Sequence, residues 1–209
     1  MKDFAELLDR LVLTPARNGK LTLIRDYLTA TPDPDRGYAI AAITRDLEVA
    51  SVKPAMLRTL VAERIDPVLF ELSYDYVGDL AETISLVWGP RVPGATDLTL
   101  SGVVETLQRL SRHDAPREVA RWLDAMDAPA RHALLKLVTG GLRVGVSARL
   151  AKQALADWGG ADVAEIEELW HGLSPPYADL FAWLEGRAPK PAQAAKAPFR
   201  PVMLANPVE

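Results

Sequence analysis

The chain has no cysteine among its 209 residues. A disulfide framework, a thiolate metal site and a cysteine nucleophile are therefore excluded. No apolar run approaches the ~18 residues that a membrane-spanning helix needs. The first six residues are acidic and amphipathic, unlike a secretory signal. We therefore expect a soluble, cytoplasmic protein that does not bind membranes.

The sequence also lacks the alternating pattern of a half-buried strand. Apolar residues recur instead at helical spacing, as in Phe4, Leu7, Leu8 and Leu11. This periodicity predicts an all-α fold, a compact domain of about twelve helices in two groups along the chain. We expect the first group near residues 4–11, 20–30, 38–46, 54–61, 67–77 and 79–87, and the second, after a loop rich in Pro and Gly at 88–98, near 102–110, 116–126, 129–138, 148–157, 162–170 and 176–185.

The composition changes at residue 188. Residues 188–209 contain five prolines and no acidic residue before Glu209, which is typical of an extended linker. We therefore expect a helical domain at residues 1–187 and a Pro/Ala-rich linker at 188–209 that leads to a further domain of a longer parent protein.

Opposite charges are concentrated in different parts of the chain. The formal net charge is −4, but residues 106–152 hold nine cations against four anions, a local net of +5. Residues 61–105 hold two cations and eight anions, a local net of −6. This distribution favours one face for an anionic partner. The alternative is a chance run of solvated helix faces.

Residues 137–147 carry the most informative motif, three glycines around one arginine. Gly140, Gly141 and Gly145 surround Arg143, and Ser147 is a good N-cap for the helix expected after it. Glycines permit positive φ and close approach of a ligand, and a helix N-terminus attracts anions. The segment therefore predicts a phosphate-binding site. The alternative is a plain helix connector with a solvated arginine.

The motifs of common active sites are missing. The three histidines have no metal-ligand spacing, and neither a phosphate-binding loop nor a nucleophile elbow is present. None of the seven lysines stands in Lys-x-Asp-Gly, where it could carry a nucleotidyl group. We therefore expect this chain to have no catalytic residues, no metal site and no cofactor of its own, and to act by binding.

Four segments carry a resemblance to a known family. The segments are Val77-Gly78-Asp79-Leu80-Ala81-Glu82, Leu98-Thr99-Leu100-Ser101-Gly102-Val103, Gly140-Gly141-Leu142-Arg143-Val144-Gly145-Val146-Ser147 and Pro198-Phe199-Arg200-Pro201-Val202-Met203-Leu204-Ala205. With these segments in the family's order, the chain resembles the N-terminal DNA-binding domain of ATP-dependent DNA ligases, particularly the bacterial multi-domain type. Many relatives place a second basic residue where Gly141 stands, so a contact there would be made by the backbone alone.

The resemblance implies an all-helical module that lies along the minor groove of nicked double-stranded DNA. It also implies that adenylation and OB-fold domains follow residue 209 and carry the lysine nucleophile, ATP and Mg²⁺. The parent protein would then be associated with the nucleoid and seal nicks in repair, replication or recombination. This fragment alone would be inactive. The DNA-binding residues expected on this basis are Gly140, Gly141, Arg143, Gly145, Ser147, Arg149 and Lys152, with Arg17, Asn18, Lys20, Arg117 and Arg121 as further candidates.

Two other functions fit the same observations. A helical protein–protein interaction scaffold without DNA affinity fits the acidic net charge and the missing catalytic motifs. An enzyme of unfamiliar type would have to use the acidic first half of the chain. Salt-dependent binding to nicked duplex DNA separates the ligase module from the scaffold.

Overall fold

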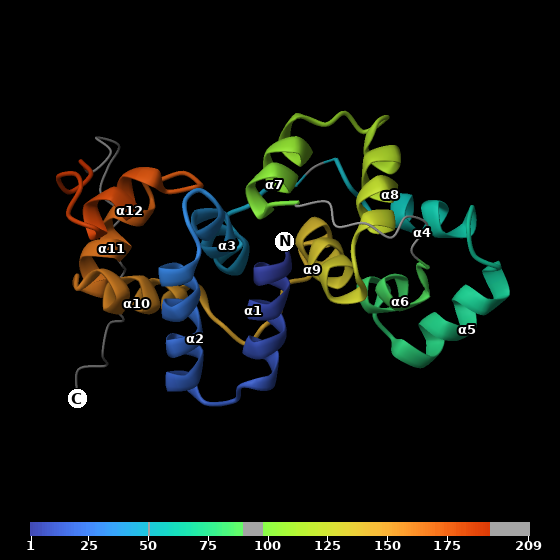
Figure 1. Cartoon of the computed structure of the whole chain (residues 1–209), viewed down its shortest axis with the longest axis horizontal. Helices are drawn as coiled ribbons and strands as arrows, with labels where there is room; N and C mark the ends of the chain where they lie inside the picture. Colours follow the sequence, from blue (N-terminus) through green and yellow to red (C-terminus); the bar gives the residue numbers. More distant parts are fainter. Residues whose placement is uncertain (50, 90–97, 193–209) are drawn as a thin grey trace, which may run out of the picture.

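The computed structural model describes residues 1–49, 51–89 and 98–192, which form twelve helices and no strand (Figure 1). The expected all-α fold is confirmed. The helices are α1 (Lys2–Leu13), α2 (Arg17–Ala30), α3 (Asp35–Thr44), α4 (Pro54–Ala62), α5 (Pro67–Val77), α6 (Leu80–Val87), α7 (Leu100–Arg109), α8 (Ala115–Ala125), α9 (Ala128–Thr139), α10 (Ala148–Gly159), α11 (Val163–Trp170) and α12 (Ala178–Leu184).

Half of the twelve helices begin with a side-chain cap. The side chains of Asp66, Asp79, Thr99, Asp127, Ser147 and Asp162 each accept a hydrogen bond from a backbone N–H of the helix that follows. Four helices, α4, α5, α8 and α9, also carry proline in their first turn. These residues end the preceding loops and fix where each helix begins.

Two helices begin three residues earlier than the apolar pattern predicts. The first turn of α2 contains Arg17, Asn18 and Gly19, and that of α3 begins at Asp35. Arg17 and Asn18 are exposed, so they leave no apolar repeat to mark the turn. The difference matters here because it places Arg17 and Asn18 on a helix and not in a loop.

The two groups of helices follow one another along the chain but mix in space. Helix α9 packs against both α1 and α6, and α10 packs against α2, α3 and α11. Figure 1 shows α9 between α1 and α6, and α10 beside α2. Helices from both sides of residues 88–98 therefore share one core.

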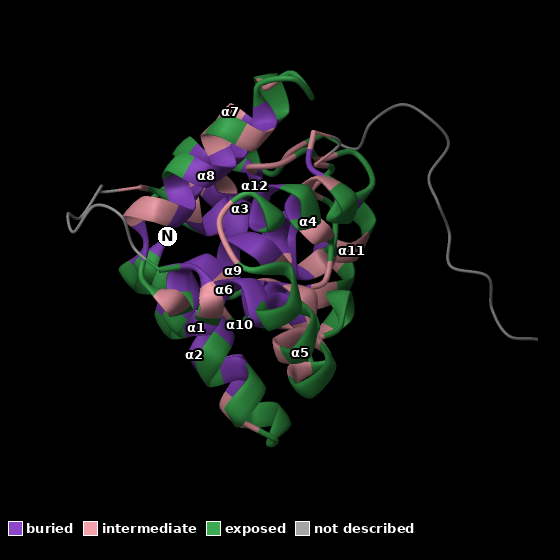
Figure 2. Cartoon of the chain, turned by 90° about the vertical axis from the view of Figure 1, so that its right-hand side faces the viewer, coloured by how far each residue is buried: buried purple, intermediate pink, exposed green. Residues whose placement is uncertain are grey.

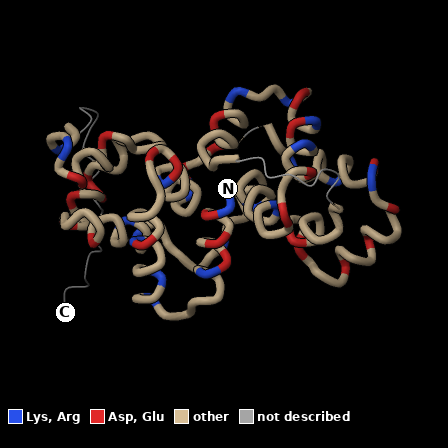
Figure 3. Tube along the Cα trace, viewed as in Figure 1, with Lys and Arg blue, Asp and Glu red and all other residues tan. Residues whose placement is uncertain are grey.

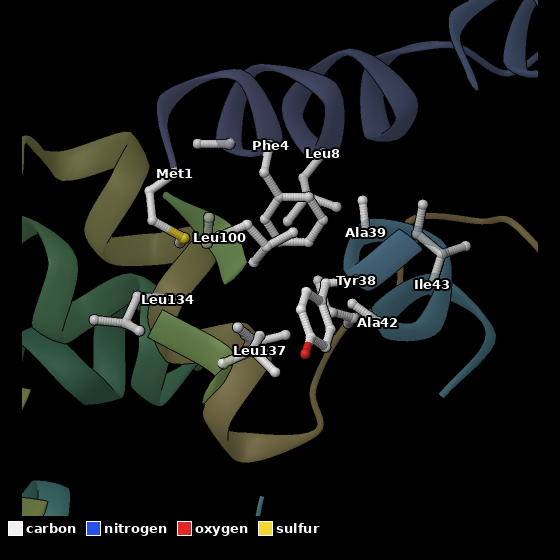
Figure 4. Packing of buried hydrophobic residues seen from close by; sticks show 14 of the residues in the cluster. Met1, Phe4, Leu8, Tyr38, Ala39, Ala42, Ile43, Leu100, Leu134 and Leu137 are labelled. Atoms are coloured by element: carbon white, nitrogen blue, oxygen red, sulfur yellow. The ribbon is translucent and has the colours of Figure 1, made fainter. Parts of the chain in front are cut away.

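That core is continuous through the centre of the molecule (Figure 2). Phe4 and Leu8 of α1 point toward Tyr38 of α3 and Leu137 of α9, and all four side chains are buried (Figure 4). Apolar burial of this kind is the main stabilising contribution to such a fold. One shared apolar interior thus fixes the positions of helices from both groups relative to one another.

A buried arginine ties α9 to the last turns of α8 and to the residue that follows α6. Arg131 is 4% exposed, and its Nε donates to the carbonyl oxygen of Leu123 at 2.7 Å. Its Nη1 donates to the carbonyl oxygen of Trp88, just after α6. These bonds satisfy carbonyl groups at helix ends, which a buried helix terminus requires.

The expected linker is described only at its beginning. Residues 188–192 are not helical, and residues 193–209, which include the fourth resembling segment, lie outside the described residues. In the described part of the chain, no helix is both long enough and apolar enough to cross a membrane.

Candidate nucleic-acid interface

The glycine-rich segment begins with a helix C-cap. Helix α9 ends at Thr139 and is capped by Gly140, which has φ of 67°, and the N–H of Gly141 donates to the carbonyl oxygen of Lys136 at 3.0 Å. A left-handed residue at this position is usual where a helix reverses, and glycine adopts it without steric cost. Gly140 therefore sets the direction in which the following segment leaves α9.

The next three residues alternate between core and solvent. Leu142 and Val144 are each 7% exposed, whereas Arg143 between them is exposed. Within the described residues, Arg143 has neither an ion pair nor a hydrogen bond. The two buried neighbours anchor the backbone while Arg143 offers an unpaired guanidinium group to a ligand.

Lys20 of α2 is buried beneath the other end of this segment and is hydrogen-bonded to it. Lys20 is 8% exposed, and its Nζ donates to the carbonyl oxygens of Val144 at 2.8 Å and Gly145 at 3.0 Å. Gly145 has φ of 65°, and a Cβ added there would overlap Lys20 Nζ. The expected contact of Lys20 with DNA stays a prediction, and the burial of its ammonium group and the two hydrogen bonds that this group donates to the loop disfavour it.

Ser147 begins α10, as the sequence predicts. Its hydroxyl oxygen accepts a hydrogen bond from the N–H of Leu150 at 3.1 Å. The Arg149 side chain is 82% exposed, and its Nε lies 4.0 Å from a carboxylate oxygen of Glu167, so the pair is loose. Arg149 thus adds a second accessible cation one residue into the first turn of α10.

Lys152 is less accessible than Arg149. Its Nζ lies 4.8 Å from the centre of the Trp170 ring. Partial burial lowers the pKa of Lys152, although Glu167 and Asp46 act in the opposite direction. Lys152 is half-buried and already has an aromatic partner, so it is a weaker candidate for a phosphate contact than Arg149.

The first and third resembling segments meet at a cavity of about 230 Å³. Asp79 and Glu82 line it together with residues 141–144. Asp79 Oδ2 accepts from Lys136 Nζ at 2.6 Å, which joins the start of α6 to the last turn of α9. Burial opposes ionisation of Asp79, but the Lys136 hydrogen bond, the N–H of Glu82 and nearby positive charge together lower its pKa.

The remaining candidate residues do not all gather at the segment. Arg17 and Asn18 are exposed at the start of α2, and Arg17 lies one helical turn from Lys20. Arg117 and Arg121 belong to α8, which Figure 1 shows well separated from the connection between α9 and α10. Arg121 is also paired with Glu118.

Part of the positive charge of residues 106–152 is used inside the protein. Arg131 is buried, and Lys136 pairs with Asp79. The charges along the chain are consequently more mixed at the surface than the local net of +5 indicates (Figure 3). Arg143 and Arg149 are the accessible cations closest in sequence to the glycines.

Sequence reasoning missed the supports of this segment. The bond from Lys20 to Val144 joins residues 124 positions apart, and no local pattern marks such a pair. A weak signal did exist for Asp79, since it stands in a resembling segment and in a capping position. Its partner Lys136 is 57 residues away and could not be assigned.

Two comparisons with known proteins bear on this arrangement. A family model described as DNA ligase N terminus matches residues 1–156, which include α1–α9, the glycine-rich segment and most of α10. No curated protein matches the chain. Because the family match covers well over half of the chain, the chain belongs to the DNA ligase N terminus family, the N-terminal domain of ATP-dependent DNA ligases.

Proposed function

We propose that this chain is the DNA-binding module of an ATP-dependent DNA ligase. It binds nicked duplex DNA by contacts to the phosphate backbone and the minor groove of the DNA. The observation that carries the proposal is Arg143, an exposed and unpaired cation in a glycine-rich segment whose shape is fixed by buried neighbours. Contacts to phosphate and to the minor groove read charge and shape. They suit an enzyme that must accept a nick in any sequence.

The backbone around Arg143 supports the same contact. Gly140 and Gly145 have positive φ and are exposed, so no Cβ atom at either glycine hinders close approach of a ligand to the backbone beside Arg143. The N-terminus of α10 follows directly, with Arg149 in its first turn. A helix N-terminus and an adjacent cation both favour an anion such as phosphate. Arg17 and Asn18 extend the surface onto α2, while Arg117 and Arg121 would bind only if the DNA path also reached α8.

The chemistry of sealing belongs to other parts of the parent protein in this proposal. The adenylation and OB-fold domains would carry the lysine nucleophile and hold ATP and Mg²⁺, which supply the adenylyl group. In the described ranges, no group of three or more His, Asp or Glu side chains is placed to hold a metal ion. The role of this chain is to hold DNA for repair, replication or recombination, and a nucleoid location would follow from that binding.

The test is fluorescence anisotropy of a labelled nicked duplex titrated with the chain at several salt concentrations. Neutralising about three phosphates, as Arg17, Arg143 and Arg149 would, gives a slope of log K against log[salt] of about −3. A duplex of scrambled sequence should bind within a few-fold of the first. Affinity that does not change with salt, or that depends strongly on sequence, would contradict the proposal.

A further inference from the structure

A second surface lies on α5, away from the glycine-rich segment. Only Phe70 of this helix is buried. Four apolar side chains are largely exposed: Val68 by 65%, Leu69 by 55%, Leu72 by 64% and Tyr76 by 92%. Figure 2 shows α5 exposed or half-exposed along nearly all of its length. This density of exposed apolar residues on one short helix is unusual for a surface that faces only water.

These four residues share one face of the helix. Val68, Leu72 and Tyr76 follow one another at intervals of four, and Leu69 lies three residues before Leu72. Phe70, the residue that packs into the core, projects from the opposite side. We call the four residues the α5 stripe. Because α5 packs substantially only against α4 and α6, nothing in the described residues covers the stripe.

Negative charge borders the α5 stripe. Glu71 and Asp75 adjoin it on α5, and neither has an ion pair within the described ranges. Residues 61–87 hold six acidic residues and one basic residue, Arg64, which is bound to Asp124. Acidic positions accordingly predominate along α5 and α6 (Figure 3). DNA and anionic lipid would both be repelled here, and a symmetric contact with a second copy would bring like charges together.

We propose that the α5 stripe is a docking site for a protein partner that presents an amphipathic helix with Lys or Arg beside its apolar face. Residues 68–76 span about 12 Å, so the stripe matches roughly two turns of a partner helix. Side-chain ridges of two helices interdigitate in such a contact, and the apolar groups of both leave water. The acidic border then pairs with the partner's cations and fixes its orientation.

The stripe gives the chain a second role that is independent of DNA binding. The glycine-rich segment follows α9, whereas α5 lies at the far right of the molecule in Figure 1. A protein bound at α5 would therefore leave Arg143 free to contact DNA. This arrangement would let one chain recruit another protein to the nick that it occupies.

A pair of synthetic peptides of about 18 residues, or five helical turns, provides the probe. Both carry Leu on one face, and the other face is Lys in the first peptide and Glu in the second. We expect the full chain to bind the Leu/Lys peptide at least tenfold more tightly than the Leu/Glu peptide. Leu72→Ser combined with Tyr76→Ser should weaken Leu/Lys binding at least tenfold and leave the affinity for nicked DNA unchanged.

The matched control is Val12→Ser combined with Leu13→Ser, two residues of α1 that are 63% and 81% exposed. This variant should bind the Leu/Lys peptide as the wild type does. Equal losses in both variants, or a Glu71→Gln/Asp75→Asn variant with an unchanged preference for Lys, would overturn the proposal. Two further measurements are self-association in sedimentation and binding to anionic vesicles. If either one is lost in the Leu72/Tyr76 variant while that variant still binds the peptide, the proposal is also overturned.

Discussion

The ammonium group of Lys20 donates a hydrogen bond to the carbonyl oxygen of Gly145, 125 residues further along the chain. The same group reaches Val144, so α2 and the segment before α10 are joined by one buried cation. Two backbone carbonyl groups accept hydrogen bonds from this ammonium group, and no carboxylate pairs with it in the described residues. The shape of the segment around Arg143 thus depends on a residue that does not itself face the ligand.

Replacing Lys20 by Met should weaken DNA binding without changing its salt dependence. Met keeps the apolar stem but removes both hydrogen bonds, each of which involves a charged group and contributes about 1.5–3 kcal/mol at most. The melting temperature should fall as well. Anisotropy at several salt concentrations checks this, because a lost phosphate contact would reduce the slope by about 1 and a lost support would not. Unchanged affinity would show that Lys20 does not position the segment.

Arg143→Ala should weaken binding to nicked duplex by about 1–3 kcal/mol and reduce the salt slope by about 1. Folding should be almost unaffected, because the side chain is exposed and has no polar partner in the described residues. Thermal melts and anisotropy on the same protein measure the two effects. Arg25→Ala on α2 is the control and should bind like the wild type. An Arg143→Ala protein with full affinity would refute the contact.

Two glycines with nearly equal φ provide a matched pair. Gly140→Ala and Gly145→Ala both force alanine into the left-handed region, at a cost of roughly 1–2 kcal/mol. Only the new Cβ at position 145 would meet Lys20, because the space around Gly140 is open. Gly145→Ala should therefore lose more stability and more DNA affinity than Gly140→Ala.

The stability that Gly145→Ala loses should depend on the presence of Lys20. In a Lys20→Met background, the added cost of Gly145→Ala should shrink toward that of Gly140→Ala, since the ammonium group is no longer there to be displaced. Urea unfolding of the single and double variants measures this coupling. Strict additivity would show that the overlap is relieved at no cost in the single variant.

The Asp79–Lys136 pair should make stability depend on pH in the acid range. The pKa of Asp79 in the folded state lies below its ordinary value of 3.8, so ionised Asp79 stabilises the fold above pH 3.8. That contribution is lost as the pH falls below 3.8 toward the folded-state pKa. Asp79→Asn retains a capping side chain and removes the charge. Its free energy of unfolding should fall below that of the wild type at neutral pH and converge with it in acid.

Lys136→Met serves as the background for that measurement. Without the ammonium group, the effect of Asp79→Asn should become smaller and less dependent on pH. Chemical denaturation of all four proteins completes the cycle. A pH-independent difference between wild type and Asp79→Asn would rule out the ion pair as its source.

The isolated chain should not become labelled by ATP. None of its lysines stands in the Lys-x-Asp-Gly context of a nucleotidyl carrier. Incubation with ATP labelled in the adenylyl group and with Mg²⁺, followed by acid precipitation, measures covalent transfer. Label retained on the chain would contradict the non-catalytic role.

The sequence predicts those features that neighbouring residues determine. Ser147 marks the start of α10 because a capping hydroxyl acts within three residues. Lys20 and Arg131 look like surface cations because nothing nearby in the chain indicates burial. Their partners are carbonyl groups brought to them by helix packing, and that packing mixes the two groups of helices. The position of Arg143 was predictable, whereas the structure that supports it was not.

The packing of α1 against α9 has a consequence for synthesis of the protein. Helix α1 ends at residue 13, whereas α9 begins at residue 128 and α10, the partner of α2, at residue 148. At translation rates of about 5–20 residues per second, α9 is synthesised roughly ten seconds after α1, and until then the apolar face of α1 lacks this packing partner. Phe4, Leu8 and Leu11 remain open to chaperones or to other nascent chains during that time. The domain therefore completes its fold only after most of its residues have left the ribosome.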